Sequence, residues 1–144
     1  MFARLGALII VGLLGSACAA NPPARHGVAS DLKTYPQSTP KEAFEAVLKA
    51  VDLKRIDYLL AHLAEADWVD EQVKLYAGGF PDLVKETTEK MNDTAVKQLQ
   101  RFLKEGDMET LETTAVVRHK TIKDRVVRFR KVEGRWFLLH SNKP

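Results

Sequence analysis

Between residues 39 and 106, apolar residues recur at spacings of three and four, which is the period of an amphipathic helix. The first helix is predicted to begin at Thr39-Pro40-Lys41-Glu42, because threonine can cap, proline suits the first helical position and glutamate completes a capping box. Its apolar stripe comprises Ala43, Phe44, Val47, Leu48 and Val51. The pattern resumes after Asp52, which either caps a second short helix or marks a bend in the first.

Two further helical stretches are predicted before the character of the chain changes. One runs from Glu65 to Tyr76 and ends at Gly78-Gly79-Phe80-Pro81, where glycine and proline break the periodicity. The next opens at Asp82 and continues to Gly106, with an interruption at Asn92-Asp93-Thr94, where Asp93 or Thr94 could cap a fresh start.

Beyond Gly106, β-branched and aromatic residues dominate, and this composition predicts strands. The predicted strands are Thr110 to His119, Arg125 to Val132 and Arg135 to Ser141. Glu133-Gly134 is expected to join the last two as a tight hairpin, because glycine accepts the positive φ of such turns. The chain therefore predicts an α+β fold in which N-terminal helices pack on a curved antiparallel sheet of three or four strands.

A two-residue turn at Glu133-Gly134 sets the register of the last hairpin. The predicted pairs are Lys131 with Trp136, Phe129 with Leu138, and Val127 with His140. Alternation then places Val127, Phe129, Trp136 and Leu138 on one face, and Arg128 and Arg130 on the other beside Phe137 and Leu139. Apolar residues on both faces indicate either a ligand or partner on the second face, or a curved sheet.

The composition limits the classes of protein to which the chain can belong. With 144 residues, 45% hydrophobic and 28% charged, the chain is typical of one globular domain. A single cysteine excludes an intrachain disulfide and a cysteine-based metal cluster, so packing alone must hold the core. The net charge is only +3, and cations and acids are interleaved, so nucleic acid is not an expected partner.

The N-terminus has the order of a secretory signal. A basic start at Met1 to Arg4 precedes the apolar run Leu5 to Leu14, and small residues follow from Gly15 to Ala20. As a helix, ten apolar residues rise only about 15 Å, which is half the hydrocarbon thickness of a membrane. We therefore expect a signal segment at residues 1–19, a flexible tether at 20–38 and one domain at 39–144.

Two processing routes are open at Cys18. Leu14-Gly15-Ser16-Ala17-Cys18 resembles the lipobox of bacterial lipoproteins, which implies that Cys18 carries diacylglycerol as the new N-terminus. The lipobox usually has an aliphatic residue where this chain has Gly15, and Ala17-Cys18-Ala19 also fits ordinary signal peptidase. The lipoprotein route is favoured because the chain's only cysteine stands at the end of the signal.

The predicted tether is rich in proline. Residues 21–40 contain four of the six prolines of the chain and show no sustained periodicity. His26, a lone histidine in this segment, is expected to be solvated.

The order of elements resembles a known superfamily. Helices followed by a meander that ends in Val132-Glu133-Gly134-Arg135-Trp136-Phe137-Leu138-Leu139 are similar to the NTF2-like superfamily, and within it to small bacterial lipoproteins of the DUF4878 kind. The opening Thr39-Pro40-Lys41-Glu42-Ala43-Phe44, followed by Asp52-Leu53-Lys54-Arg55, also fits. The resemblance implies a cystatin-like cone, a sheet curled around a helix to form a pocket, which hosts both enzymes and nonenzymatic modules.

Candidate binding residues follow from residue type and position. Aromatic, imidazole and guanidinium groups on the predicted pocket and outer sheet face point to ligand binding by Tyr58, Trp68, Arg128, Arg130 and His140. The alternative, a pocket enzyme of the isomerase or cyclase class, would use His119, His140 or Asp57 as acid-base groups. No pattern of metal ligands or cofactor motif appears.

The sequence therefore predicts an exported protein of the bacterial envelope that is membrane-anchored through Cys18, or else periplasmic or secreted. Its domain is expected to bind a small ligand or an envelope protein without catalysing a reaction. No catalytic residue, metal or cofactor is assigned.

Overall fold

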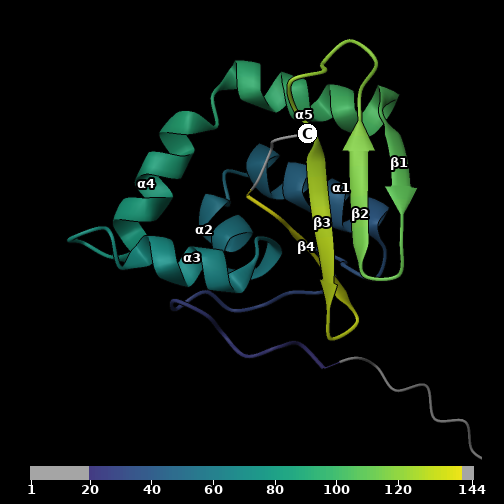
Figure 1. Cartoon of the computed structure of the whole chain (residues 1–144). Helices are drawn as coiled ribbons and strands as arrows, with labels where there is room; N and C mark the ends of the chain where they lie inside the picture. Colours follow the sequence, from purple (N-terminus) through teal and green to yellow (C-terminus); the bar gives the residue numbers. More distant parts are fainter. Residues whose placement is uncertain (1–19, 141–144) are drawn as a thin grey trace, which may run out of the picture.

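The computed structural model describes residues 20–140, so the predicted signal segment, Cys18 and the end of the last predicted strand lie outside the described residues. Five α-helices, one π-helical turn and four strands follow one another in this part of the chain (Figure 1). Their bounds are α1 Pro40–Asp52, α2 Ile56–Tyr58, η1 Leu59–Leu63, α3 Ala66–Val73, α4 Phe80–Lys90, α5 Asp93–Glu105, β1 Asp107–Thr110, β2 Thr114–Arg118, β3 Val127–Val132 and β4 Arg135–Leu138. The fold is α+β, with the helices before the sheet.

The predicted start of α1 is confirmed by its caps. The hydroxyl of Thr39 accepts a hydrogen bond from the Glu42 amide, and the Glu42 carboxylate accepts one from the Ser38 amide, both at 3.1 Å. Asp52 is the last residue of α1 rather than the cap of a new helix. A turn with Lys54 at a φ of 58° separates α1 from α2, so the first helix ends here and does not continue through a bend.

Local chemistry also explains the later helix boundaries. The amide of Ala64 bonds to the Leu59 carbonyl five residues back, which makes η1 a π-helical turn. The predicted interruption before α5 is confirmed, but the cap is Asn92 and not Asp93 or Thr94: the side chain of Asn92 accepts from the Ala95 amide at 3.0 Å. Helix α4 begins at Phe80 rather than at Asp82, because Pro81 fits its first turn.

The sheet is an antiparallel meander in the order β1-β2-β3-β4. The single strand predicted from Thr110 to His119 is wrong: β1 and β2 form a hairpin, with Thr110 opposite Ala115. The Leu111 amide bonds to the Thr114 carbonyl at 2.8 Å and closes the turn between them. This turn contains neither glycine nor proline, and its β-branched flanks look like one continuous strand in the sequence.

The predicted register of the last hairpin is confirmed where the strands are paired. Lys131 lies opposite Trp136 and Phe129 opposite Leu138. The ladder ends at Leu138, so the predicted pair of Val127 with His140 does not form. Glu133 and Gly134 both have positive φ, 49° and 77°, as a turn matched to the twist of the strands requires.

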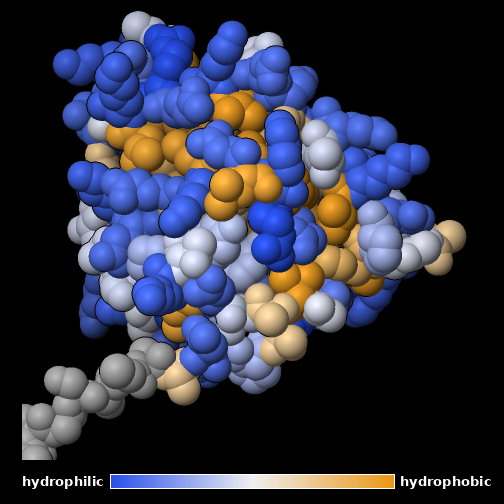
Figure 2. All heavy atoms as spheres, turned by 180° about the vertical axis from the view of Figure 1, so that it is seen from behind, coloured by the Kyte–Doolittle hydropathy of each residue, from blue (hydrophilic) through white to orange (hydrophobic). Residues whose placement is uncertain are grey.

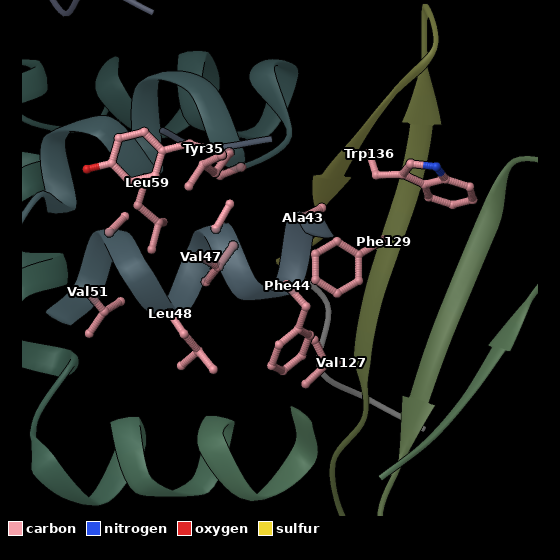
Figure 3. Close-up of a cluster of buried hydrophobic side chains, with 14 of the residues drawn as sticks. Tyr35, Ala43, Phe44, Val47, Leu48, Val51, Leu59, Val127, Phe129 and Trp136 are labelled. Atoms are coloured by element: carbon pink, nitrogen blue, oxygen red, sulfur yellow. The ribbon is translucent and has the colours of Figure 1, made fainter. Parts of the chain in front are cut away.

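The core lies between α1 and the sheet. Phe44 of α1 and Phe129 of β3 are almost fully buried, with ring centroids 5.5 Å apart. Figure 3 shows Phe44 beside Phe129 and Val127, with the remaining apolar positions of α1 directed to the helices on either side of it. In Figure 1, α1 lies behind the sheet, while α5 crosses one end and α4 and α3 extend away from it.

The structure differs from the predicted tether at residues 20–38. Tyr35 and Gln37 are only 4% and 2% exposed, and the Tyr35 ring stacks on Tyr58 at 4.1 Å. The Asp31 amide donates to the Tyr58 hydroxyl at 2.9 Å. The prolines indicated an extended segment, but the aromatic and amide side chains within it find buried partners on the domain.

His26 also departs from expectation. Its ring stacks on Phe80 at 4.4 Å, and its Nε2 lies 3.0 Å from the Asp70 carboxylate. Arg25 pairs with the same carboxylate. The N-terminal segment is therefore held to the start of α4 and to α3 as well as to the core.

Apolar surface is scattered over the exterior. Figure 2 shows orange areas divided by blue side chains on the face opposite to Figure 1. Among residues 20–140, the large apolar side chains that are exposed are Leu53, Leu75, Leu111 and Val132.

We expect Gln37→Ala to lower the free energy of unfolding by about 1–3 kcal/mol, because two buried carbonyls would lose their donor. The Gln37 amide nitrogen donates to the carbonyls of His62 and Trp136, at 3.1 and 2.8 Å. Urea unfolding of the purified protein measures the change. Gln100→Ala, an exposed glutamine on α5, is the matched control and should change stability by less than about 0.5 kcal/mol. Equal midpoints for the two variants would contradict the role given to Gln37.

Candidate functional site

An apolar pocket of about 290 Å³ lies between the helices and the far end of the β3–β4 hairpin. We call it the helical pocket. Its walls come from six elements, η1, α3, α4, α5, β3 and β4, and from the residues that follow β4. They include Leu59, Leu60, Trp68, Met91, Leu99, Phe102, Val127, Leu138 and His140. In Figure 1, α3 and α4 lie to the left of β3 and α5 lies above them. The pocket is near the lower limit of volumes that hold small molecules.

Trp68 and His140 form one wall of the helical pocket. Their rings stack with centroids 4.1 Å apart and planes 11° from parallel. They meet because the start of α3 is tied to the end of β4: Ala64 forms a parallel bridge with Leu138, and the Glu65 amide donates to the Leu138 carbonyl at 2.9 Å. The π-helical turn directs Ala64 to this edge, so local helix geometry places the aromatic wall.

Cationic side chains stand at the rim of the helical pocket. Lys90 and Arg125 are the charged groups that line it among residues 20–140, and no carboxylate does. The guanidinium of Arg125 donates to the Gln98 amide oxygen at 3.0 Å, and Lys90 pairs with Glu86 outside the lining. Partial burial, with Lys90 nearby, lowers the pKa of His140, so its imidazole is neutral at neutral pH. Arg125 also lies 4.0 Å from the carboxylate of Asp124, so the pocket is apolar inside and its two rim cations pair with acids that stand outside the lining.

A second pocket, of about 350 Å³, lies at the other end of the β3–β4 hairpin. We call it the hairpin groove. It is bounded by the N-terminal segment, the start of α3 and the outer face of the hairpin, through Pro22, Pro23, Arg25, His62, Glu65, Asp67, Arg130, Val132, Glu133, Arg135 and Phe137. Two of its three arginines pair with acids, Arg130 with Glu65 and Arg25 with Asp70.

The structure brings together two of the five predicted binding residues. Trp68 and His140 share the helical pocket, and Arg130 lies apart in the hairpin groove. Arg128 is half-buried on the outer sheet face and lines neither pocket. Tyr58 is 1% exposed, and its hydroxyl is engaged by Asp31, so it belongs to the core.

The proposed acid-base residues do not meet. Asp57 forms two hydrogen bonds with the Arg55 guanidinium, at 2.9 and 3.0 Å, and this contact lowers the pKa of Asp57. His119 donates through Nε2 to the Glu105 carboxylate at 2.8 Å, and its Nδ1 accepts from the Thr121 amide at 3.1 Å. The hydrogen bond to His119 lowers the pKa of Glu105. Of Asp57, His119 and His140, the helical pocket contains His140 alone.

Several lining residues were missed by the sequence analysis, among them Lys90, Gln98 and Arg125 as rim groups. One signal was present. Ala95, Gln98, Leu99 and Phe102 follow the three-to-four spacing of α5, so a polar residue stands within an apolar stripe. An amide in that position is typical of a helix face that borders a cavity rather than a closed core.

Residues 20–140 contain no group of three or more histidine, cysteine, aspartate or glutamate side chains arranged to hold a metal ion. The helices that the structure describes are all too short or too polar to cross a membrane.

Comparison of the chain with protein-family models, with curated proteins and with solved structures finds no match. The function proposed below therefore rests on the geometry of the chain itself.

Stability is expected to fall as the pH drops below about 6.5, because burial lowers the pKa of His62 from its ordinary value. His62 is 3% exposed, and its Nε2 donates to the Val28 carbonyl at 2.7 Å. Since the folded pKa is depressed, the unfolded state binds more protons in this range; the stabilisation is complete above the unfolded pKa and is lost towards the folded one.

Urea unfolding at pH 7.5 and 5.5 measures this loss, where both pH values are chosen to lie about one unit to either side of the ordinary histidine pKa. His62→Gln should reduce the difference between the two conditions. His140→Gln is the matched comparison, because the pKa of His140 is also lowered by partial burial. Each variant should remove the part of the pH dependence that its own histidine causes. A pH dependence unchanged by His62→Gln would contradict the assignment.

Proposed function

We propose that the chain is an exported, lipid-anchored envelope protein whose domain binds a small apolar ligand with an anionic end, without catalysing a reaction on it. The observation that carries this proposal is the helical pocket, whose walls are apolar and whose rim presents Lys90 and Arg125 with no lining carboxylate. An apolar body would be removed from water inside, while an anionic group would stay at the rim.

The chemistry of the lining supports this ligand class. Leu59, Leu99 and Phe102 offer only van der Waals contact, which favours an alkyl or ring-shaped group. The stacked Trp68 and His140 provide a flat aromatic wall. Lys90 and Arg125 are exposed enough to turn towards a carboxylate or sulfonate without burying an unpaired charge.

A binding role is favoured over the isomerase or cyclase alternative by the placement of the acid-base candidates. Asp57 is paired with Arg55 and His119 with Glu105, each away from the helical pocket. His140 stands there without a second titratable partner within hydrogen-bonding distance among the described residues. General acid-base chemistry on a bound ligand usually needs such a partner or a positioned water.

For the family, we propose the NTF2-like superfamily. Its support is the order of helices before an antiparallel meander and a pocket between the helices and the sheet. For location, the support is the signal-like order of residues 1–19 and the single cysteine at its end.

The anionic dye anilinonaphthalene sulfonate matches the proposed ligand class and should bind the helical pocket. We expect Ala95→Phe to abolish this binding, because Ala95 lines the pocket and a phenyl group would fill it. Dye fluorescence, titrated with the purified protein, measures the affinity. Thr94→Phe places the same ring on an exposed position of α5 and should leave binding intact. Equal loss in both variants would argue against the pocket as the site.

Removal of the rim charges should weaken the binding of the same dye. Lys90→Gln and Arg125→Gln are each expected to raise Kd by up to about fivefold, because a solvent-exposed ion pair contributes about 0.2–1 kcal/mol. Lys85→Gln, an exposed lysine of α4 outside the lining, is the control. An affinity that responds equally to all three changes would indicate nonspecific attraction.

Mass spectrometry of the mature N-terminus tests the anchor. We expect a diacylglyceryl group on Cys18 and no residue before it. Cys18→Ser should move the protein from the membrane fraction or leave it unprocessed. A mature chain that begins at Ala20 without modification would overturn the lipid anchor.

A further inference from the structure

The hairpin turns of the sheet meet at one end of the molecule. The Lys131 amide donates to the Thr113 carbonyl at 2.8 Å, which sets the β1–β2 turn beside the end of the β3–β4 hairpin. We call this end the sheet tip, comprising residues 111–113 and 131–135. Figure 1 shows both turns pointing in the same direction.

Two of the four exposed large apolar side chains lie on the sheet tip. Leu111 is 62% exposed and Val132 is 46% exposed. Lys131 and Arg135 flank Val132, and no ion pair is found for either among residues 20–140. Glu112 and Glu133 keep the tip close to neutral, so apolar contact rather than net charge is its distinctive property.

The N-terminal segment begins next to the sheet tip. Pro22 and Pro23 line the hairpin groove together with Val132 and Glu133. Only three residues separate Cys18 from Pro22, and four residue steps span at most about 14 Å even when fully extended. Because residues 25–37 are packed on the domain, they add no length to this link.

We infer that the sheet tip docks on the phospholipid surface to which Cys18 is anchored, with Leu111 and Val132 in the interface. This inference rests on the proposed anchor, because the anchor is what brings the membrane within reach. Apolar side chains at the turns would enter the boundary between headgroups and acyl chains. Lys131 and Arg135 are long enough to keep their charges among the lipid phosphates. Neutrality of the tip predicts that zwitterionic lipid suffices.

Depth-dependent fluorescence quenching tests the docking on the full, processed protein in phosphatidylcholine vesicles. Cys18 is the only natural cysteine, so in the acylated chain Leu111→Cys supplies a single reactive thiol for a fluorophore. Lipids that carry a nitroxide quencher in the headgroup region should remove most of the emission at position 111. Leu53→Cys is the matched control. Leu53 is 54% exposed at the C-terminal end of α1, outside the sheet tip, and a fluorophore there should remain unquenched.

A charge placed on the sheet tip should remove most of the quenching of a fluorophore at position 111. Val132→Asp introduces a carboxylate that would have to leave water, so the labelled protein is expected to lose most of its quenching. Leu75→Asp makes the same change at a 74% exposed residue in the turn after α3 and should have no effect. Circular dichroism of each variant establishes that it is folded.

Flotation of the vesicles in the same samples separates the two proposals. Protein that floats with equal, weak quenching at positions 53 and 111 retains the anchor and overturns the docking. Protein that does not float loses the anchor and the docking together. Strong quenching at 111 that Val132→Asp removes and Leu75→Asp leaves is the result expected.

Discussion

The side-chain amide of Gln37 joins three parts of the chain at one buried point. The side-chain nitrogen donates to the carbonyl of His62 in the helical layer and to that of Trp136 in the sheet, while the backbone carbonyl of Gln37 accepts from the Trp136 amide. The side-chain oxygen of Gln37 has no hydrogen-bond partner among residues 20–140. The two bonds that the nitrogen donates therefore offset only part of the cost of burying this amide. The course of the N-terminal segment, the position of the hairpin groove and the starting point of the link to Cys18 all depend on this contact.

Features that depend on neighbouring residues could be predicted from the sequence. The cap at Thr39, the interruption before α5 and the register set by Glu133-Gly134 follow from short-range hydrogen bonding and turn geometry. Features that depend on distant partners could not. The packing of Tyr35 requires Tyr58, and the split between β1 and β2 occurs at a turn without the usual turn residues.

The candidate site shows the same division. Trp68 and His140 were identified by residue type. Their contact results from the bridge between Ala64 and Leu138, which no local sequence pattern predicts. Tyr58 had a similar sequence context and proved to be a core residue. A pocket built from six separate elements becomes visible only when tertiary packing places them, whereas a metal site or nucleophile motif would have been recognisable in one segment.

The packed N-terminal segment also has a mechanical consequence. In a chain held at its N-terminus, a pulling force loads the contacts of the segment in sequence order, first Arg25 with Asp70, then Tyr35 with Tyr58, and last Gln37. The segment would peel away before the sheet is strained, because these contacts open one after another rather than together. Complete release of residues 20–38 would lengthen the link by up to about 60 Å. In a chain held in this way, the packed segment would act as a reserve of length that the contacts store until a force opens them.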